Sequence, residues 1–376
     1  MAQMKHIDSK HFWASGFVVQ INEDQYFAGH GPFQPVTLQK NSFQEQLGLN
    51  RLLIKPQYWD FLTASKDQTE ALQPAASAVL TKKEFQDLIS TLSAANNSLT
   101  DLDSLNASTW AQNFKIDFTH QFKVMQEWIS KGILEKAVPI GRVTTELKKI
   151  FQPEIILKNL IADSTARGWI YGFWNQQQGF LGRTPELLFQ SFPVDSKTIT
   201  TMALAGTWPK NPDLVNDYED PKIWNEHQIV VKDIKTQLAG FEFVRQSATE
   251  VIELKNLSHL KTHLEFQYNS AEQILDVIQD LHPTAALGIY PRNLELNKKI
   301  NLLPLQVARG HFGAPFGIIS RDVSHMVVAI RGISWQQNQI QLFAGCGITE
   351  DSQLESEYQE ILIKMDAVKK MLGFLI

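Results

Sequence analysis

Three charged residues near the carboxyl terminus have a spacing that could form an ionic site. Glu357, Glu360 and Lys364 are separated by three and four residues, so in a helix their charged groups project from one face. Glu360 and Lys364 also have the spacing of an ordinary surface ion pair between residues i and i+4. The spacing alone therefore leaves open both a functional site and a solvent-exposed pair.

Histidines and an adjacent glutamate form two further candidate groups. Glu226 and His227 are neighbours in a segment with helical periodicity, where an exposed charged turn is the simpler interpretation. His259 and His263 are four residues apart, which would suit two metal ligands on a helix. The leucines around them follow neither the helical nor the strand period, which argues against a histidine metal site.

Three glycine-containing turns could bring backbone N–H groups close to an anionic ligand. They are Ala205–Thr207, Gly310–Gly313 and Ala344–Gly347, and a side chain with a Cβ would obstruct such an approach. None has the glycine spacing of a dinucleotide site or the Lys-Ser/Thr ending of a P-loop, and simple hairpin turns are the alternative. Cys346, between two glycines, is better interpreted as a small filler than as a nucleophile.

Composition excludes several classes of protein. The 376 residues include 35 Lys plus Arg and 40 Asp plus Glu, a formal net charge of −5, which argues against nucleic-acid binding. A single cysteine excludes a disulfide framework and a cysteine-based zinc site. No apolar run approaches the roughly 18 residues of a membrane helix, and the first residues lack a signal-peptide core. We therefore expect a soluble, cytoplasmic protein with no membrane partner.

Hydrophobic periodicity predicts the elements that would position these residues. Apolar residues three and four apart predict helices, and the last helix is expected to begin at a capping box formed by Ser352 and Glu355. Short aromatic and β-branched runs predict strands, with a hairpin between Met326–Ile330 and Ile340–Ala344. The other predicted elements are helices Phe118–Gly132 and Trp224–Leu238, and strands Ala137–Ile140, Trp169–Trp174, Phe180–Leu181, Leu187–Phe189 and Thr198–Ala203.

The amino-terminal third has a less regular pattern. Met1 to about Phe61 contains strand-like runs, whereas Thr63–Trp110 is rich in Ser, Thr, Ala, Asn and Gln and is expected to be the longest connection. Weak helical periodicity occurs within it at Lys82–Leu92. Strands and helices in irregular order, with many strands joined as hairpins, favour an α+β architecture over a doubly wound parallel sheet.

The order of the segments resembles the chorismate-utilising enzymes, which include anthranilate synthase component I, aminodeoxychorismate synthase, isochorismate synthase and salicylate synthase. The resemblance runs from about Lys136 to Leu372, and seven blocks in the same order are far more specific than any single motif. The blocks are Glu135–Val138, Arg183–Leu188, Leu204–Thr207, Asn225–His227, Leu281–Ala286, Ala329–Arg331 and Ala344–Ile348, the last leading into Glu357, Glu360 and Lys364.

The resemblance implies two large antiparallel β-sheets packed face to face with helices outside. It separates a diverged part, residues 1–115, which contributes strands to the same fold, from a chorismate-binding catalytic region, residues 116–376. It also implies Mg²⁺, with Glu226, Glu357 and Glu360 as the metal-binding carboxylates. Arg331 and Lys364 would meet the two carboxylates of chorismate. The substrate-binding residues implied in this way are Ala205, Gly206, Thr207, His259, Ala286, Phe312, Arg331, Gly345 and Lys364.

Individual residues select the reaction within this family. Aminodeoxychorismate enzymes have a nucleophilic lysine immediately before Gly206, where this chain has Ala205. Lys136 resembles the general base of the water-using branch, which the ammonia-using anthranilate synthases lack. Glu186 would be the general acid that protonates the leaving hydroxyl, a role that requires a raised pKa. An ordinary surface charge is the competing interpretation of Lys136.

Water as the nucleophile predicts an isochorismate synthase with no obligatory glutaminase subunit. Salicylate synthases share Lys136 and Glu186 but carry Thr and Tyr in place of Ala286 and Phe312, which favours isochorismate as the released product. The alternatives are a salicylate synthase, an anthranilate synthase-like enzyme, or a diverged non-catalytic chorismate-binding protein. Both menaquinone and siderophore biosynthesis would fit as the pathway.

Three residues depart from the family pattern. Ile223 stands where the family usually has an acidic residue shortly before Glu226, and Ile289 and Ala314 each replace a glycine. Ile223 is expected to weaken metal binding. At Ile289 and Ala314 the added side chains are expected to reduce the space where the family's glycines let backbone segments approach closely.

Overall fold

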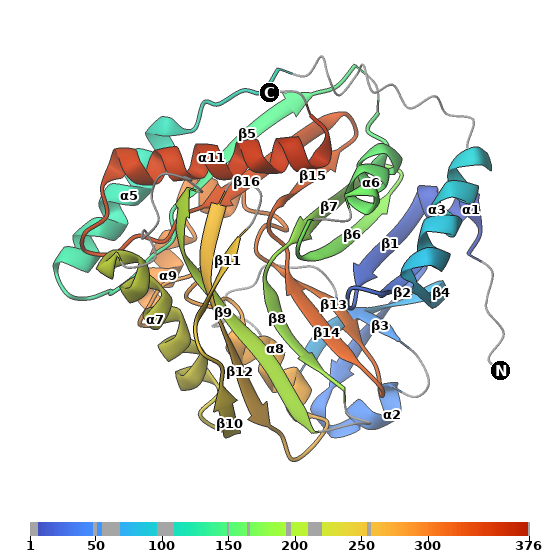
Figure 1. Cartoon of the computed structure of the whole chain (residues 1–376), viewed down its shortest axis with the longest axis horizontal. Coiled ribbons are helices and arrows are strands. Elements are labelled where there is room, and N and C mark those ends of the chain that lie inside the picture. Colours follow the sequence, from blue (N-terminus) through green and yellow to red (C-terminus); the bar gives the residue numbers. More distant parts are fainter. Residues whose placement is uncertain are drawn as a thin grey trace.

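Short apolar runs in every third of the chain pair edge to edge, so that the described strands join into one antiparallel sheet of 16 strands with helices at its outside (Figure 1). The computed structural model of the chain describes residues 7–47, 51–54, 68–95, 109–148, 150–163, 166–192, 197–209, 220–253 and 257–374. The predicted α+β antiparallel fold is confirmed.

The sheet does not follow the chain order. Its neighbours run β10-β12-β9-β8-β14-β13-β3-β4-β2-β1-β6-β7-β15-β16-β5, and β11 pairs with β12. The strands are β1 Ser15–Gln20, β2 Gln25–Gln39, β3 Leu52–Ile54, β4 Gln68–Thr81, β5 Ile140–Glu146, β6 Trp169–Asn175, β7 Gln178–Thr184, β8 Leu187–Ser191, β9 Thr198–Pro209, β10 Glu242–Gln246, β11 Glu250–Glu253, β12 Leu257–Gln267, β13 Pro315–Ile319, β14 Ser324–Val328, β15 Gly332–Gln336 and β16 Gln339–Gly345.

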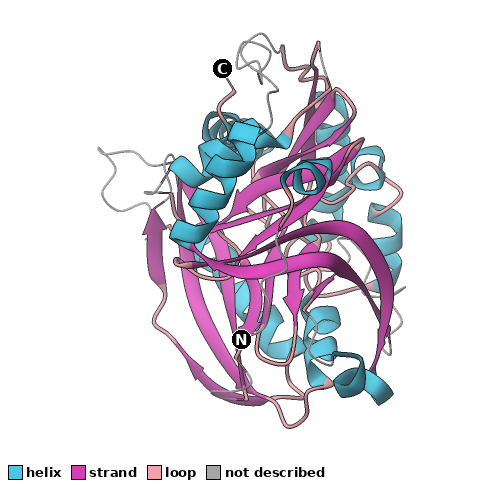
Figure 2. Ribbon diagram, turned by 90° about the vertical axis from the view of Figure 1, so that its right-hand side faces the viewer, coloured by secondary structure: helices cyan, strands magenta, loops and turns pink. Residues whose placement is uncertain are grey.

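Two long strands, β2 and β4, connect the halves of the sheet. They pair along their lengths with a bulge between His30 and Phe33, and long strands curve across the molecule in Figure 2. Tyr26 belongs to one buried apolar cluster and Leu38, on the same strand, to another. The sheet is therefore continuous from one half to the other through this pair of strands.

The two halves face each other through a third apolar cluster. Phe17 of β1 and Phe180 of β7 lie on one side, and Phe316 of β13 and Val327 of β14 lie on the other. Phe180 and Phe316 meet edge to face with ring centroids 5.1 Å apart. Burial of such large aromatic side chains is a main source of stabilisation in a two-layer fold.

Helices cover the outer faces of both halves. The half with β5, β6, β7, β15 and β16 packs against α1, α3, α5, α6, α9, α10 and α11, and the half with β8, β9, β12 and β14 packs against α2, α7 and α8. The helices are α1 Ser9–Ala14, α2 Phe43–Leu47 with the preceding 3₁₀ turn Lys40–Ser42, α3 Lys82–Ala95, α5 Lys115–Ser130, α6 Pro153–Ala162, α7 Pro221–Gln237, α8 Gln273–Leu281, α9 Leu294–Ile300, α10 Pro304–Val307 and α11 Leu354–Leu372.

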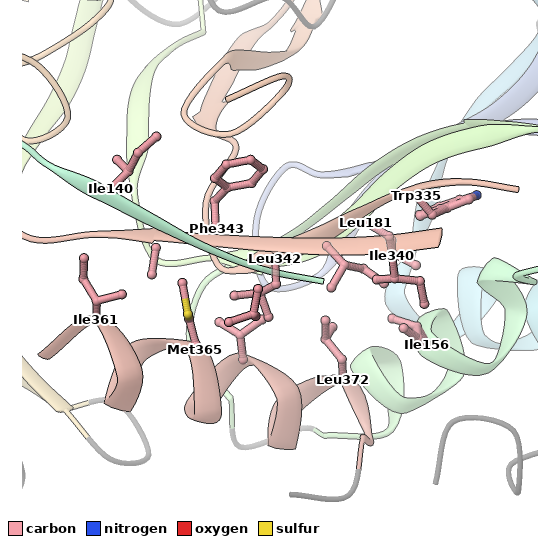
Figure 3. Packing of buried hydrophobic residues seen from close by; sticks show 14 of the residues in the cluster. Ile140, Ile156, Leu181, Trp335, Ile340, Leu342, Phe343, Ile361, Met365 and Leu372 are labelled. Atoms are coloured by element: carbon pink, nitrogen blue, oxygen red, sulfur yellow. The ribbon is translucent and has the colours of Figure 1, made fainter. Parts of the chain in front are cut away.

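Helix α11 shows how an apolar stripe places charged residues at the site. Ile361, Met365 and Leu372 point at β16, where Leu342 points back toward the helix, whereas Phe343 points to the opposite side (Figure 3). Strand geometry produces this alternation, because successive side chains leave opposite faces. The same helix ends at Gly373, which has a left-handed φ of 91° and is the usual type of residue for that position.

Several predictions about single elements are wrong. The predicted connection Thr63–Trp110 contains β4 and α3, and α3 extends beyond the predicted Lys82–Leu92. Strand β4 is stabilised by pairing with β2 rather than by its own composition. Strand β16 forms its hairpin with β15, while β14 pairs with β13 and β8. The capping box is absent: α11 has no side-chain cap, and Ser352 Oγ accepts a hydrogen bond from the Thr349 N–H instead. Strand β5 begins only at Ile140, with Lys136 and Ala137 in isolated bridges.

Candidate active site

A cavity of about 640 Å³, including its open mouth, lies where the two halves of the sheet and helices α7 and α11 meet. Most of the sequence-predicted site residues line it, although they come from distant parts of the chain. Those residues are Glu186, Ala205, Thr207, Glu226, His259, Ala286, Phe312, Arg331, Gly345 and Lys364. The sheet topology therefore gathers ten predicted residues around one space.

Four other predicted residues lie beside the cavity lining. Lys136 contacts Glu226, and Glu360 contacts Lys364. Gly206 is part of β9 and has a left-handed φ of 75°. A Cβ there would lie 2.7 Å from the Ile223 carbonyl oxygen and 2.8 Å from its Cγ2, so the family departure at Ile223 is a buried packing residue. The fourth, Glu357, is buried and forms an ion pair with Lys222.

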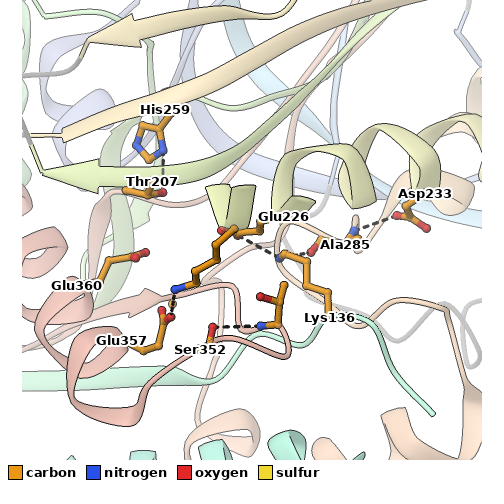
Figure 4. Close-up of polar contacts among 12 residues, drawn as sticks. Lys136, Thr207, Glu226, Asp233, His259, Ala285, Ser352, Glu357 and Glu360 are labelled. Atoms are coloured by element: carbon orange, nitrogen blue, oxygen red, sulfur yellow. Dashed lines mark hydrogen bonds and ion pairs between the residues drawn. The ribbon is translucent and has the colours of Figure 1, made fainter. Parts of the chain in front are cut away.

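Lys136 is fully buried, which excludes the surface-charge interpretation. Its Nζ donates a hydrogen bond of 2.6 Å to the Ala285 carbonyl and lies 3.6 Å from Glu226 Oε1 (Figure 4). Burial, with a smaller contribution from Lys364, lowers the pKa of Lys136, whereas Glu226 opposes the shift. A lowered pKa makes a lysine available as a base, because more of it is neutral.

Asp233 of α7 binds the backbone N–H of the residue whose carbonyl Lys136 contacts. The buried carboxylate accepts a hydrogen bond of 2.9 Å from the Ala285 N–H (Figure 4). It also forms an ion pair with Arg292, at 3.2 Å from Nε to Oδ1. Tyr290, two residues before that arginine, pairs through its backbone with Lys136. Asp233 thus fixes two segments that hold the lysine.

Glu186 lies at the turn between β7 and β8 and is only 4% exposed. Burial raises its pKa to about 7, while Lys136 and Lys364 act in the opposite direction. Its backbone N–H donates to Thr184 Oγ1, and its carbonyl accepts a hydrogen bond from the Val328 N–H. A cavity-facing carboxyl with this pKa is substantially protonated near neutrality, as a general acid must be.

Three carboxylates lie near one another, and each is paired with a lysine. The distances between nitrogen and oxygen are 3.6 Å for Lys136 and Glu226, 2.5 Å for Lys222 and Glu357, and 2.5 Å for Lys364 and Glu360. Burial is the main reason why the pKa values of Glu226 and Glu357 are raised, and the negative charge of the neighbouring Glu360 raises them further.

The carboxylates match Mg²⁺ in donor chemistry, because that ion prefers oxygen ligands and usually binds through one or two carboxylates. Their mutual repulsion would also be relieved by a cation. Among the described residues, however, no three His, Cys, Asp or Glu side chains converge into a preformed metal site. His263 lies four residues along β12 from His259 and does not contribute to the cavity lining.

A chain of hydrogen bonds in the cavity lining ends at a guanidinium. Arg331 Nη2 lies 3.2 Å from His259 Nε2, and His259 Nδ1 lies 2.9 Å from Thr207 Oγ1. Burial lowers the pKa of His259 well below its ordinary value, with further contributions from Arg331 and Lys364. The imidazole is therefore neutral, with Nε2 accepting from Arg331 and Nδ1–H donating to Thr207.

Apolar residues form another part of the cavity wall. The rings of Phe312 and Phe343 stack with centroids 5.7 Å apart, and Ala286 lies in the same lining. Ile289 and Ala314 are buried but do not line the cavity. These two family departures therefore affect packing behind the site rather than its surface.

Lys222 and Gly347 are among the residues at the site that were not named individually as candidates from the sequence. Lys222 pairs with Glu357 across 135 positions, a contact that no local pattern could have revealed. Gly347 lines the cavity, and a Cβ there would lie 1.9 Å from Glu226 Oε1 and 2.8 Å from Lys136 Cε. Its place in a glycine-rich turn was the available signal, because such turns permit close approach.

Comparison with known proteins agrees with this architecture. The model of the family described as "Chorismate binding enzyme" matches residues 18–373, so the chain belongs to the chorismate-binding enzymes. The resemblance predicted from the sequence is thereby confirmed at the level of the family.

Several relatives are named isochorismate synthase. The enzyme MenF of Bacillus subtilis is 32% identical over 269 residues, which is 69% of this chain and 56% of that protein. The salicylate biosynthesis isochorismate synthase of Pseudomonas aeruginosa is 32% identical over 204 residues, 52% of this chain and 42% of that protein. These matches thus span about half the length of the curated relatives.

A solved structure supports the fold over the whole chain. The crystal structure of a putative 2,3-dihydroxybenzoate-specific isochorismate synthase, DhbC, from Bacillus anthracis has a TM-score of 0.75 and 19% identity, and the match covers 99% of each chain. No helix in the described part of the present chain is long and apolar enough to cross a membrane.

Proposed function

We propose that the protein is an isochorismate synthase that converts chorismate to isochorismate. The observation that carries the proposal is the presence at one site of a buried lysine, Lys136, whose pKa is lowered, and a buried glutamic acid, Glu186, whose pKa is raised to about 7. The reaction needs both, because a water molecule must be deprotonated and a departing hydroxyl must be protonated.

In the proposed step, Lys136 takes a proton from a water molecule whose oxygen bonds to C2 of chorismate. The ring double bonds shift as the C4–O bond breaks, and Glu186 donates a proton to the departing hydroxyl, which leaves as water. One water enters and one leaves, so substrate and product are isomers. Glu186 and Lys136 then exchange protons with solvent to restore the starting state.

The cationic side chains would hold the two substrate carboxylates. Arg331, whose guanidinium is fixed by His259, and Lys364, which also donates to the Gly345 carbonyl at 2.9 Å, are the proposed anion-binding groups. Glu226 and Glu360 would hold Mg²⁺ directly and Glu357 through water. When bound, Mg²⁺ would neutralise the ring carboxylate and fix its position.

The choice of water over nitrogen nucleophiles follows from two positions. Ala205 lines the cavity where a covalent lysine nucleophile would be needed, and Lys136 supplies a base for water. Ala286 and Phe312 bring no hydroxyl to the wall, so the later elimination of pyruvate to salicylate would lack polar support. Isochorismate is therefore the proposed released product.

The wider assignments are part of the same proposal. Residues 116–376 would form the catalytic region, and residues 1–115 would complete the fold through β1 to β4. The enzyme would act in the cytoplasm without a glutaminase subunit, in either menaquinone or siderophore biosynthesis.

Product analysis and metal binding test the proposal separately. Purified protein with chorismate and Mg²⁺ should release isochorismate on chromatography, whereas anthranilate, salicylate or tight binding without turnover would contradict it. Calorimetric titration should show Mg²⁺ binding that Glu360→Gln weakens at least tenfold. Glu355→Gln, on the same helix but exposed and paired with Lys115, is the matched control and should bind Mg²⁺ as the wild type does.

A further inference from the structure

The backbone of Arg331 adopts a conformation that a residue with a Cβ rarely takes. Its φ is 57°, in the left-handed region that favours glycine. The residue lies in the short connection between β14 and β15, and its carbonyl accepts a hydrogen bond from the Arg183 N–H at 3.3 Å. Surrounding contacts must hold such a conformation in place.

One of those contacts comes from Tyr171 of β6. Its hydroxyl donates a hydrogen bond of 2.9 Å to the Ile330 carbonyl, which belongs to the peptide unit directly before the Arg331 Cα. Fixing that peptide restricts rotation about φ of Arg331. Tyr171 is 3% exposed, and burial raises its pKa, so the hydroxyl keeps its proton and donates.

Two glycines allow the tyrosine to reach this carbonyl. In the sheet register Tyr171 of β6 pairs with Gly182 of β7, and Gly182 pairs with Gly332 of β15. A Cβ on Gly182 would lie 3.0 Å from the Tyr171 hydroxyl, and one on Gly332 would lie 2.7 Å from it. The tyrosine side chain therefore crosses two strands that present no side chain in its path.

We infer that Tyr171 is a positioning residue, whose hydroxyl holds the Ile330–Arg331 peptide so that the Arg331 guanidinium faces the cavity beside His259. The inference rests on the proposed function in one respect, namely that Arg331 binds a substrate carboxylate. The contact with His259, at 3.2 Å, is made by the far end of the side chain. Tyr171 acts at the other end, on the backbone from which that side chain leaves.

Tyr171→Phe removes only the hydroxyl and keeps the ring, so it isolates this hydrogen bond. A crystal structure of the variant should show Arg331 outside the left-handed region and its contact with His259 lost. The KM for chorismate should rise about tenfold with kcat changed less than threefold, because a carboxylate anchor binds substrate and transition state alike. Tyr268→Phe is the control, since that buried hydroxyl, bonded to Ser191 Oγ at 3.2 Å, lies outside the cavity lining.

Different results would overturn the role of Tyr171 and the proposed function. An unchanged Arg331 conformation in Tyr171→Phe, or a KM equal to that of Tyr268→Phe, would overturn the inference. A wild-type protein that does not convert chorismate would overturn the proposed function, while the crystal structure would still decide the role of Tyr171. In the Arg331→Ala background, Tyr171→Phe should cause less than a twofold change in chorismate affinity, and a full tenfold effect there would show that the hydroxyl acts elsewhere.

Discussion

Replacing Glu186 with glutamine is expected to stabilise the fold and to remove turnover. Glutamine has nearly the same shape, but it cannot ionise in the buried position that raises the pKa of this carboxyl to about 7. The wild type must either keep a proton on Glu186 or bury a charge, and the unfolded chain has no such constraint. The variant removes that difference between the two states.

The magnitude follows from the pKa in the two states. The ordinary value is 4.5 and the folded value is about 7, so between these pH values the folded protein holds a proton that the unfolded chain has released. Stability of the wild type therefore falls as pH rises through this window. One pKa unit corresponds to about 1.4 kcal/mol. Relative to acidic pH, where Glu186 is protonated in both states, the free energy of unfolding of the wild type is therefore lower by about 1 kcal/mol at pH 5 and by about 3 kcal/mol above pH 7.

Chemical denaturation at pH 5, 6, 7 and 8 would measure this difference. The free energy of unfolding of Glu186→Gln should exceed that of the wild type by a margin that grows from pH 5 to pH 8. Glu23→Gln, an exposed glutamate between β1 and β2, is the control and should keep the wild-type pH dependence. Turnover of Glu186→Gln should fall by about 10²- to 10⁴-fold, the usual contribution of a general acid.

If the difference in the free energy of unfolding between Glu186→Gln and the wild type did not change with pH, Glu186 would be ionised in the folded protein at neutrality. That result would refute the assignment of Glu186 as general acid. Retained turnover in the variant would refute it independently of the stability measurement.

Three other variants test separate parts of the site. Lys136→Gln should abolish water addition, because the proposed base is lost, and slow anthranilate formation with added ammonium would be visible by fluorescence. Gly347→Ala should lower turnover at least a hundredfold in a kinetic assay, because the added Cβ would lie only 1.9 Å from Glu226 Oε1 and would overlap that carboxylate. The double variant Ala286→Thr/Phe312→Tyr should gain measurable salicylate and pyruvate by chromatography, because it restores two hydroxyls to the wall.

Each of these variants has an outcome that would contradict the reasoning. Wild-type turnover in Lys136→Gln would leave the buried lysine with a purely structural role. Full activity in Gly347→Ala would mean that Glu226 can move without consequence. Salicylate as the main product of the unmodified enzyme would refute the reasoning from Ala286 and Phe312, although membership of the family would stand.

Elements with a strong local pattern were predictable from the sequence. The apolar stripe of α11, from Tyr358 to Leu372, and that of α7 are periodic enough to define a helix without any tertiary information. Strand β4 was not predictable, because its Ser, Ala and Gln residues acquire strand structure by pairing with β2. Strand order has the same origin in contacts between distant segments, which explains the wrong hairpin partner of β16.

The site was predictable to the extent that its residues belong to recognisable blocks. Motif order brought Lys136, Glu186 and Arg331 to attention, and the structure places Glu186 and Arg331 in the lining of one cavity and Lys136 against it. The residues that support them were missed, because their partners are remote in the chain. Tyr171 and Ile330 are separated by 159 positions and Lys222 and Glu357 by 135, so only the folded sheet reveals these contacts.

Turnover of chorismate in H₂¹⁸O with Mg²⁺ is the most direct test of water attack at C2. Isochorismate formed in the first turnovers is expected to carry one ¹⁸O, in its C2 hydroxyl, as determined by mass spectrometry and by the isotope shift of the C2 carbon resonance. Isochorismate without ¹⁸O would show that the hydroxyl migrates within the substrate, and it would contradict the roles assigned to Lys136 and Glu186.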